Sequence, residues 1–248
     1  MKKYAVIVAG GAGVRMGAEV PKQFLLLQGK AVLWWTLETW LGVYDDLEII
    51  LVVPEAYRES AKLLVDGFEG GGRIRLVSGG DTRFHSVRNG LALIEEKNAV
   101  IFVHDGVRCL VSAALIQRCY EQALQSGSAI PVIDCRDSVR LAEDEGRSKP
   151  IDRSRIKLVQ TPQTFKGEIL LPAYTQDHQE SFTDEATVVE ESGQAVYLIE
   201  GEASNIKITL PGDIVYADYI LGERGAAKQE RVRKQGGVAS VESGVGEE

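Results

Sequence analysis

A glycine-rich loop follows the first apolar run of the chain and carries two cations. Residues 8–24 read VAGGAGVRMGAEVPKQF, with Gly10, Gly11 and Gly13 ahead of Arg15 and Lys22. Backbone N–H groups of glycines can close around an anion because no side chain stands in the way. Fixed cations beside a phosphate stabilise the charge that redistributes during phosphoryl chemistry. The loop therefore predicts a site where a phosphate reacts and is not merely held.

This loop matches neither of the two best-known phosphate-binding patterns. In the dinucleotide fingerprint, Gly11 and Gly13 take the first two glycine positions, but Met16 stands where the third is required. In the Walker A loop, the second glycine position falls on Arg15 or Met16. The pattern disfavours a dehydrogenase and a Walker-type nucleotide site.

Short apolar runs alternate with stretches of helical spacing, and these elements must position the loop. The apolar runs cover residues 4–9, 47–53, 74–77, 99–104 and 128–133. Between them, Val87, Leu91 and Ile94 share one helical face, and a second helix is predicted over 112–125. Apolar strands alternating with helices indicate a mostly parallel sheet covered on both faces. We therefore predict an α/β fold, a three-layer, doubly wound, Rossmann-like domain over residues 1–222.

Two segments break this alternation. Residues 134–163 are highly charged, and the weakly apolar runs SVRLA and IKLVQT lie on either side of a turn at EDEG. We predict a hairpin arm over about residues 134–160 that projects from the sheet, a feature that often mediates dimer contacts. Residues 223–248 are charged and glycine-rich, with too little apolar content to pack, so we expect a disordered or loosely helical tail.

The composition narrows the class of protein. The chain has 248 residues, a formal net charge of −8 and a pI of about 5.1, which argue against a nucleic-acid or anionic-membrane partner. Cys109, Cys119 and Cys135 have no CxxC spacing, which suits a reducing cytosol and argues against a disulfide framework or a zinc site. The first apolar run is too short for a signal peptide or a membrane span. We expect a soluble cytoplasmic protein.

Six segments, in order along the chain, resemble the nucleotidyltransferases that activate polyol phosphates. The TPQ, TDEA and NIK motifs are the specific part of this match, since many nucleotidyltransferases share the glycine loop. The matching segments are GGAGVRMG with PKQF (10–24), SGGDTRFHSVRNGL (78–91), VHDGVR (103–108), DRSRIKLVQTPQTF (152–165), FTDEAT (182–187) and NIKIT (205–209). The resemblance implies cytidylyl transfer from CTP to 2-C-methyl-D-erythritol 4-phosphate. Ribitol 5-phosphate stays open as the alternative acceptor.

The resemblance also implies a role for the matching polar residues. Arg15 and Lys22 would neutralise the α-phosphate of CTP, and Ser86 would contact the cytosine. Asp105 would bind Mg²⁺, which takes one or two carboxylates plus phosphate oxygens. The expected catalytic residues are Arg15, Lys22, Arg153 and Lys207. The expected nucleotide-binding residues are Ala9, Gly10, Gly11, Gly13, Gly80, Arg83, Ser86, Asp105 and Gly106, and the expected polyol-phosphate ligands are Arg108, Ser138, Arg153, Thr161, Thr183 and Lys207. His104 is interpreted as a packing or hydrogen-bonding residue.

The resemblance further implies a homodimer in which the arm reaches the site of the partner chain. Ser138, Arg153 and Thr161, in or beside the arm, would then serve that site. A rival of a different class is a non-catalytic nucleotide-binding dimer on the same fold. Such a protein is expected to lose Arg15, Lys22 or Asp105, and all three are present. The chain departs from the family at Gly106-Val107, where two alanines are usual, and at Cys109 and Ser138, and these changes remove no charge that the mechanism needs.

Overall fold

The fold is built on one eight-stranded sheet. The computed structural model describes residues 1–11 and 20–238, with side chains through residue 226. The strand order is β10-β7-β11-β6-β1-β4-β5, and β12 also pairs with β7. The strands are β1 (Lys2–Val8), β4 (Leu47–Val53), β5 (Ile74–Ser78), β6 (Ala99–Asp105), β7 (Ser128–Asp134), β10 (Lys157–Val159), β11 (Gln163–Lys166) and β12 (Leu198–Glu200). The pairings of β10 and β11 are antiparallel and those among the other strands are parallel, so the sheet is mostly parallel.

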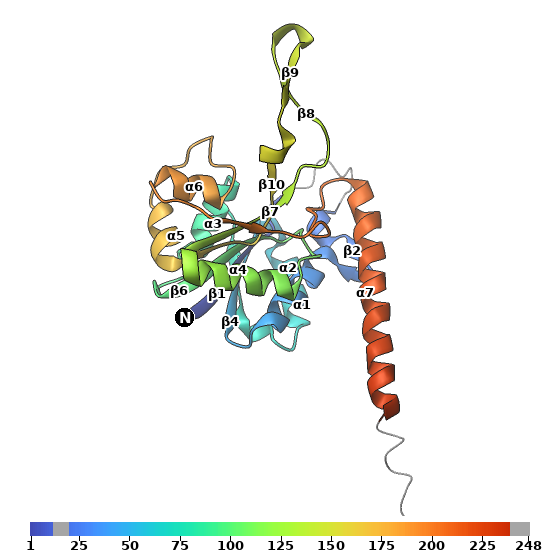
Figure 1. Ribbon diagram of the computed structural model, residues 1–248. Helices are drawn as coiled ribbons and strands as arrows, with labels where there is room; N and C mark the ends of the chain where they lie inside the picture. The colour runs from blue at the N-terminus through green and yellow to red at the C-terminus, as the bar shows by residue number, and fades with distance from the viewer. Residues whose placement is uncertain (12–19, 239–248) are drawn as a thin grey trace, which may run out of the picture.

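Helices cover both faces of the sheet, because successive side chains of a buried strand point to opposite sides. On β1, Ala5 and Ile7 belong to the core under α1, α2 and α4, whereas Tyr4 and Val6 belong to the core under α3, α5 and α6. The helices are α1 (Val32–Val43), α2 (Arg58–Asp66), α3 (Arg83–Leu91), α4 (Ala113–Ser126), α5 (Gly167–Ala173) and α6 (Glu185–Glu191). Figure 1 shows the two groups on either side of the sheet. The predicted three-layer α/β fold is confirmed.

The five predicted strands are present close to their expected bounds, and α3 and α4 lie where the helical spacing placed them. Strand β11 was not predicted. It begins directly after Pro162 with the polar residues Gln163 and Thr164, and it is inserted antiparallel between β6 and β7. This insertion brings the TPQ motif beside the end of β6, and that placement shapes the site.

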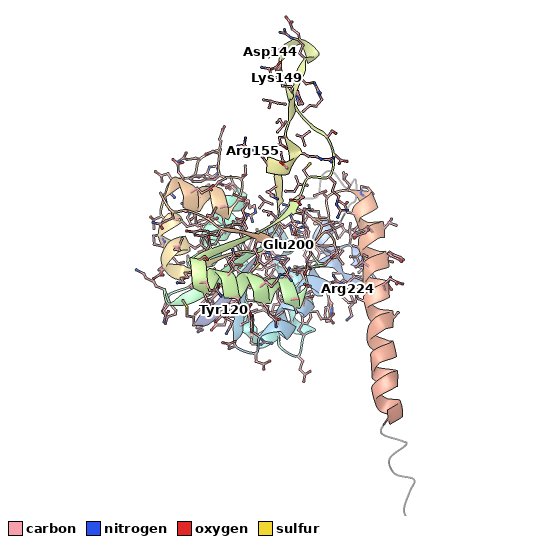
Figure 2. The ribbon with its side chains drawn as sticks, in the orientation of Figure 1. Tyr120, Asp144, Lys149, Arg155, Glu200 and Arg224 are labelled. Carbon is pink, nitrogen blue, oxygen red and sulfur yellow. The ribbon has the colours of Figure 1, made fainter. Side chains whose placement is uncertain are left out.

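The predicted arm is present as a hairpin of β8 (Val139–Ala142) and β9 (Ser148–Ile151), which projects away from the body in Figure 1. Figure 2 labels Asp144 and Lys149 toward its tip and Arg155 closer to its base. The second strand of the hairpin is not the expected run IKLVQT, because β10, at residues 157–159, pairs with β7 in the central sheet. The tight turn ends at Gly146, whose φ is +75°, so the residues just after it are the first that can pair back.

The last helix continues past residue 222, where the predicted domain ends. Helix α7 (Pro211–Val238) packs Ala217 and Leu221 against Leu27 of the β2–β3 hairpin (Leu26–Leu27 and Lys30–Ala31). Its later turns extend beyond the body in Figure 1. Of the two expectations for this tail, disordered or loosely helical, residues 223–238 take the helical one, and residues 239–248 lie outside the described residues. Residues 223–231, ERGAAKQER, consist mostly of strong helix formers, which explains the helix there.

Candidate active site

A cavity of about 300 Å³ lies at the carboxyl ends of β1, β5 and β6, which we call the first cavity. Open α/β sheets bind ligands at this edge. The residues that follow β1 form one wall, the turn from β5 into α3 forms another, and Asp105 at the end of β6 forms the floor. The lining residues used below are Ala9, Gly10, Gly11, Lys22, Gln23, Gly80, Arg83, Ser86, Asp105 and Lys207.

The turn from β5 into α3 is closed by a buried serine. The Ser86 hydroxyl accepts a hydrogen bond from the Gly80 N–H at 3.1 Å and is almost fully buried. A β-carbon on Gly80 would lie 2.5 Å from the β-carbon of His85, so only glycine fits there. A β-carbon on Gly10 would lie 3.8 Å from the Ser86 oxygen. Ser86 therefore lies between the two glycine segments that frame the first cavity.

The lysine of the PKQF motif reaches the first cavity from a short 3-10 turn, Lys22–Phe24. Its Cε would lie 3.7 Å from a β-carbon on Gly11, so the lysine side chain passes along the glycine segment. The neighbouring Gln23 is 1% exposed, and its Nε2 donates to the Ala9 carbonyl at 2.9 Å. Sequence reasoning assigned Gln23 no role, although it adjoins Lys22 in the same motif. It holds the end of β1 against this turn.

Asp105 is surrounded by three cations. Its carboxylate lies 3.0 Å from Lys207 Nζ, 3.4 Å from Arg83 Nε and 3.4 Å from Arg108 Nε. Burial alone would raise the pKa of Asp105, but Arg83, Lys207 and Arg108 outweigh it and hold that pKa well below its ordinary value. The carboxylate therefore stays ionised at any pH at which the protein works.

The backbone of Asp105 is held by Thr161, beside a neutral histidine. The Thr161 hydroxyl accepts from the Asp105 N–H at 3.0 Å and lies 3.0 Å from His104 Nδ1. His104 Nε2 lies 3.2 Å from the Arg108 carbonyl, which can only accept, so Nε2 carries the proton and Nδ1 accepts from Thr161. Burial lowers the pKa of His104 to about 3. His104 is thus a buried, hydrogen-bonded histidine, as interpreted from the sequence.

A second cavity of about 190 Å³ adjoins the first, and the two share Arg83, Asp105 and Lys207. Its further polar lining residues are Arg108, Gln160, Thr161, Gln163, Thr183 and Asp184. The Arg108 guanidinium is fixed by the Asn205 carbonyl, to which Nη1 donates at 2.8 Å. Lys207 is 41% exposed, so its ammonium remains accessible at the boundary between the two cavities.

A buried acid behind the boundary is a residue that sequence reasoning missed. Glu185 is fully buried, and both of its oxygens accept from the Arg83 guanidinium, with 2.9 Å for the Nη2 bond. The Tyr174 hydroxyl donates to the same carboxylate at 3.0 Å. Burial raises the pKa of Tyr174, so this hydroxyl keeps its proton. The TDEA motif contains Glu185, but nothing in its spacing shows that its partner is Arg83.

The structure brings most of the predicted site residues together. Those at the first cavity are Ala9, Gly10, Gly11, Lys22, Gly80, Arg83, Ser86 and Asp105; those at the second are Arg108, Thr161 and Thr183; Lys207 lines both. Ser138 and Arg153 line neither cavity and lie exposed at the base of the arm. Gly13 and Arg15 lie outside the described residues.

Gly106 does not line either cavity, and its expected nucleotide-binding role stays a prediction. Its N–H donates to the Val8 carbonyl at 2.9 Å, and its carbonyl accepts from the Thr36 hydroxyl at 2.8 Å. A β-carbon at this position would lie 3.0 Å from the β-carbon of Ala9. Gly106 therefore packs the end of β6 against the end of β1, and both of its backbone groups are hydrogen-bonded within the protein.

The residues fit a divalent cation only if the nucleotide completes its coordination. Among the described residues, no three histidine, cysteine or acidic side chains come together as a metal site. Asp105 supplies a single ionised carboxylate at the cavity floor. Mg²⁺ is commonly held by one or two carboxylates together with substrate phosphates, so this donor set suits a metal that arrives with a triphosphate.

Comparison with known proteins gives a consistent family. Residues 4–223 match the family model of 2-C-methyl-D-erythritol 4-phosphate cytidylyltransferase. Proteins of that name from Bacteroides thetaiotaomicron and Bacteroides fragilis are 45% and 46% identical to this chain, over 89% of it and 100% of their own length. The solved structure of 4-diphosphocytidyl-2C-methyl-D-erythritol synthase from Anaerococcus prevotii is 28% identical with a TM-score of 0.77, covering 89% of this chain and 96% of that one.

One further observation concerns membranes. Within the part of the chain that the structure describes, none of the helices combines the length and the apolar character needed to cross a bilayer.

Proposed function

The chain belongs to the 2-C-methyl-D-erythritol 4-phosphate cytidylyltransferase family, and from that premise we propose which of its residues bind and activate the substrates. The protein transfers a cytidylyl group from CTP to 2-C-methyl-D-erythritol 4-phosphate in the non-mevalonate isoprenoid pathway. The products are 4-diphosphocytidyl-2-C-methyl-D-erythritol and pyrophosphate. An oxygen of the acceptor phosphate attacks the α-phosphorus of CTP, and the bond from that phosphorus to the pyrophosphate oxygen breaks.

The reaction needs cations and alignment more than it needs a base. A phosphomonoester is already an anion near neutral pH, so no proton has to be removed from the nucleophile. The protein must hold two like-charged reactants in line and stabilise the charge that develops between them. The structure agrees with a reaction that needs cations and no base: His104 is buried and neutral, and the ammonium of Lys207 is exposed at the boundary.

CTP occupies the first cavity in this proposal. The backbone at Gly10 and Gly11 surrounds the triphosphate, with Arg15 and Lys22 neutralising the α-phosphate. Ser86, at the start of α3, is placed to select the cytosine together with the backbone at Gly80. Support comes from the lining of the cavity, in which a lysine and two glycine segments face one another.

The acceptor occupies the second cavity. Arg108 and Lys207 bind its phosphate, and Thr183 offers a hydroxyl to the polyol. Thr161 is assigned a positioning role instead, because its proton goes to His104 and it already accepts from the Asp105 N–H. Asp105 would hold Mg²⁺ with the triphosphate oxygens, and the bound ion would supply neutralisation of phosphate charge.

A homodimer completes the site. Ser138 and Arg153 line neither the first nor the second cavity of the described chain, so we assign them to the partner's acceptor phosphate, which the arm would reach. Leu141 on the arm and Leu158 and Val159 at its base are exposed apolar side chains that a partner chain would cover. The protein is assigned to the cytoplasm, because CTP is supplied there and its cysteines are free thiols.

The observation that carries these assignments is the sharing of Arg83, Asp105 and Lys207 by two adjoining cavities. A direct test compares turnover of methylerythritol phosphate and ribitol phosphate at equal CTP, and of CTP, ATP and GTP at equal acceptor. We expect methylerythritol phosphate and CTP to be preferred by a wide margin. Equal rates with purine nucleotides would contradict the role given to Ser86.

A further inference from the structure

The boundary between the two cavities is held by a residue that belongs to neither. Arg83 lines both cavities, whereas Glu185 lines neither and is fully buried behind it. Burial disfavours the charge of Arg83, but Glu185 and Asp105 outweigh that effect and hold the pKa of Arg83 well above its ordinary value. Because a buried carboxylate is costly without a partner, Glu185 and Arg83 fix one another. The direct contact of Glu185 with a residue that lines the cavities is its pair with Arg83.

Glu185 is also fixed from the other side, by hydrogen bonds at the start of α6. The Gln163 side chain accepts from the Ala186 N–H at 2.8 Å and donates to the Asp184 carboxylate at 2.9 Å. Asp184 in turn caps the helix by accepting from the Thr187 N–H at 2.9 Å. Gln163 is 1% exposed and also lines the second cavity, so these bonds fix its side chain at the wall of that cavity. The start of α6 is thereby joined to β11.

These contacts close a ring that passes along both cavities. Thr161 stands two residues before Gln163 and holds the backbone of Asp105. The Asp105 carboxylate contacts Arg83, and Arg83 contacts Glu185 at the head of α6. Thr183, which lines the second cavity, lies directly before the cap of that helix. A shift of Arg83 toward either cavity would therefore strain the elements that line the other.

Both substrates are negatively charged, and this ring of contacts lies where they would meet. CTP and the polyol phosphate are both anions and must lie next to each other, so each tends to weaken the binding of the other. Arg83 with Glu185 behind it is a fixed dipole whose positive end faces the boundary. Without Glu185, the guanidinium would turn to whichever anion arrived first, and the second would meet less positive charge.

We propose that Glu185 is a positioning residue that couples the two substrates, holding Arg83 at the common boundary so that CTP and the polyol phosphate bind together without competing for one guanidinium. This inference rests on the assignment of the two cavities made above. It concerns how the sites communicate and adds no group that touches a substrate.

The test is a binding measurement on the full chain. The dissociation constant of the polyol phosphate is measured by calorimetry with and without a saturating CTP analogue whose α–β bridge is methylene. The ratio of the constant without to that with the analogue is the coupling factor. We expect this factor to be one or more in the wild type and to fall at least about fivefold in Glu185→Gln, a size typical of coupled sites. Tyr174→Phe removes a hydrogen bond to Glu185 but keeps the Arg83 pair, and it should keep the wild-type factor.

Each outcome separates the possible failures. An unchanged factor in a folded Glu185→Gln protein, or the same loss in Tyr174→Phe, would overturn the proposal. Should Glu185→Gln not fold, Glu185→Asp keeps the charge but shortens the side chain that holds Arg83, and an unchanged factor there also overturns the proposal. The cavity assignment is tested separately. If Lys22→Ala does not weaken the binding of the CTP analogue alone, and Arg108→Ala does not weaken the binding of the polyol phosphate alone, the cavity assignment fails instead.

Discussion

Lys207 Nζ lies 3.0 Å from the carboxylate of Asp105 at the boundary of the two cavities. The lysine comes from an irregular segment between β12 and α7, and the aspartate comes from the end of β6. The pair therefore joins a central strand to a late part of the chain. If Asp105 holds a divalent cation as proposed, the ion and Lys207 would share this carboxylate.

Asp105→Asn should therefore lose turnover by roughly 10²-fold or more, since it removes the carboxylate proposed to bind Mg²⁺ and a partner of Lys207. Chelation with EDTA should abolish the activity of the wild type. Steady-state rates at several Mg²⁺ concentrations measure both effects. Asp66→Asn is the control, because Asp66 lies on the surface paired with Lys62. Wild-type turnover by Asp105→Asn at ordinary Mg²⁺ would show that the metal role is misassigned.

Lys22→Ala should lower kcat by roughly 10²–10³-fold, the loss seen when one preorganised donor to a transition-state charge is removed. Arg15→Ala should behave similarly. The matched control is Lys30→Ala, because Lys30 pairs with Glu38 on the surface. The kinetic constants for CTP decide between two roles. A rise confined to KM would mean that these cations hold CTP equally in the ground state and the transition state.

The stability of the protein should fall as the pH drops below about 6.5, the ordinary pKa of histidine. Burial lowers the pKa of His104 to about 3, so between these values the unfolded chain binds a proton that the folded chain does not. The free energy of unfolding therefore rises with pH across this window and is lost as the pH falls through it. Denaturant unfolding of the wild type and of His104→Gln between pH 4.5 and 6.5 measures this slope.

The His104 variant should show a shallower slope than the wild type. His178→Gln serves as the control, because that histidine is only partly buried. A slope that is identical in His104→Gln and the wild type would mean that the ring is not kept neutral by the fold.

Arg153→Ala and Lys22→Ala should each be nearly inactive as pure homodimers. If Arg153 serves the partner's site, a heterodimer of the two variants contains one site with both lesions and one site with neither. Statistical exchange makes about half of the dimers hetero, so about a quarter of the wild-type activity should return on mixing. Proven subunit exchange without any recovery would place Arg153 in the site of its own chain.

The parts of the site that lie close in sequence were predictable, and those joined by distant contacts were not. The glycine segments and Lys22 adjoin a strand whose apolar character is plain, so their place at the carboxyl edge of the sheet followed from the predicted strand. The Arg83–Glu185 pair joins α3 to α6 across the sheet edge, and no local periodicity reports such a contact.

Other misses have the same physical origin. Strand β11 is short and begins with polar residues, and its burial comes from insertion between two strands that lie far apart in sequence. The packing role of Gly106 was likewise not visible in the sequence, because it depends on the close approach of Ala9 from β1, which is distant along the chain. The charge of the arm predicted its presence. Its strands β8 and β9 pair across the turn that ends at Gly146, whereas the sequence favoured the run IKLVQT as the second strand.

The arm leaves and re-enters the sheet at neighbouring positions. Asp134 at the end of β7 stands opposite Lys157 at the start of β10 in an antiparallel pair, so the two ends of the excursion are about 5 Å apart. The hairpin is thus an excursion between two strand ends that a short connection could join directly. A chain with residues 136–155 replaced by a tight turn would keep its sheet register. This shortened chain would show whether a subunit folds without the arm that is proposed to join it to its partner. A substitution in the core cannot show this, because it changes the folding of the subunit itself.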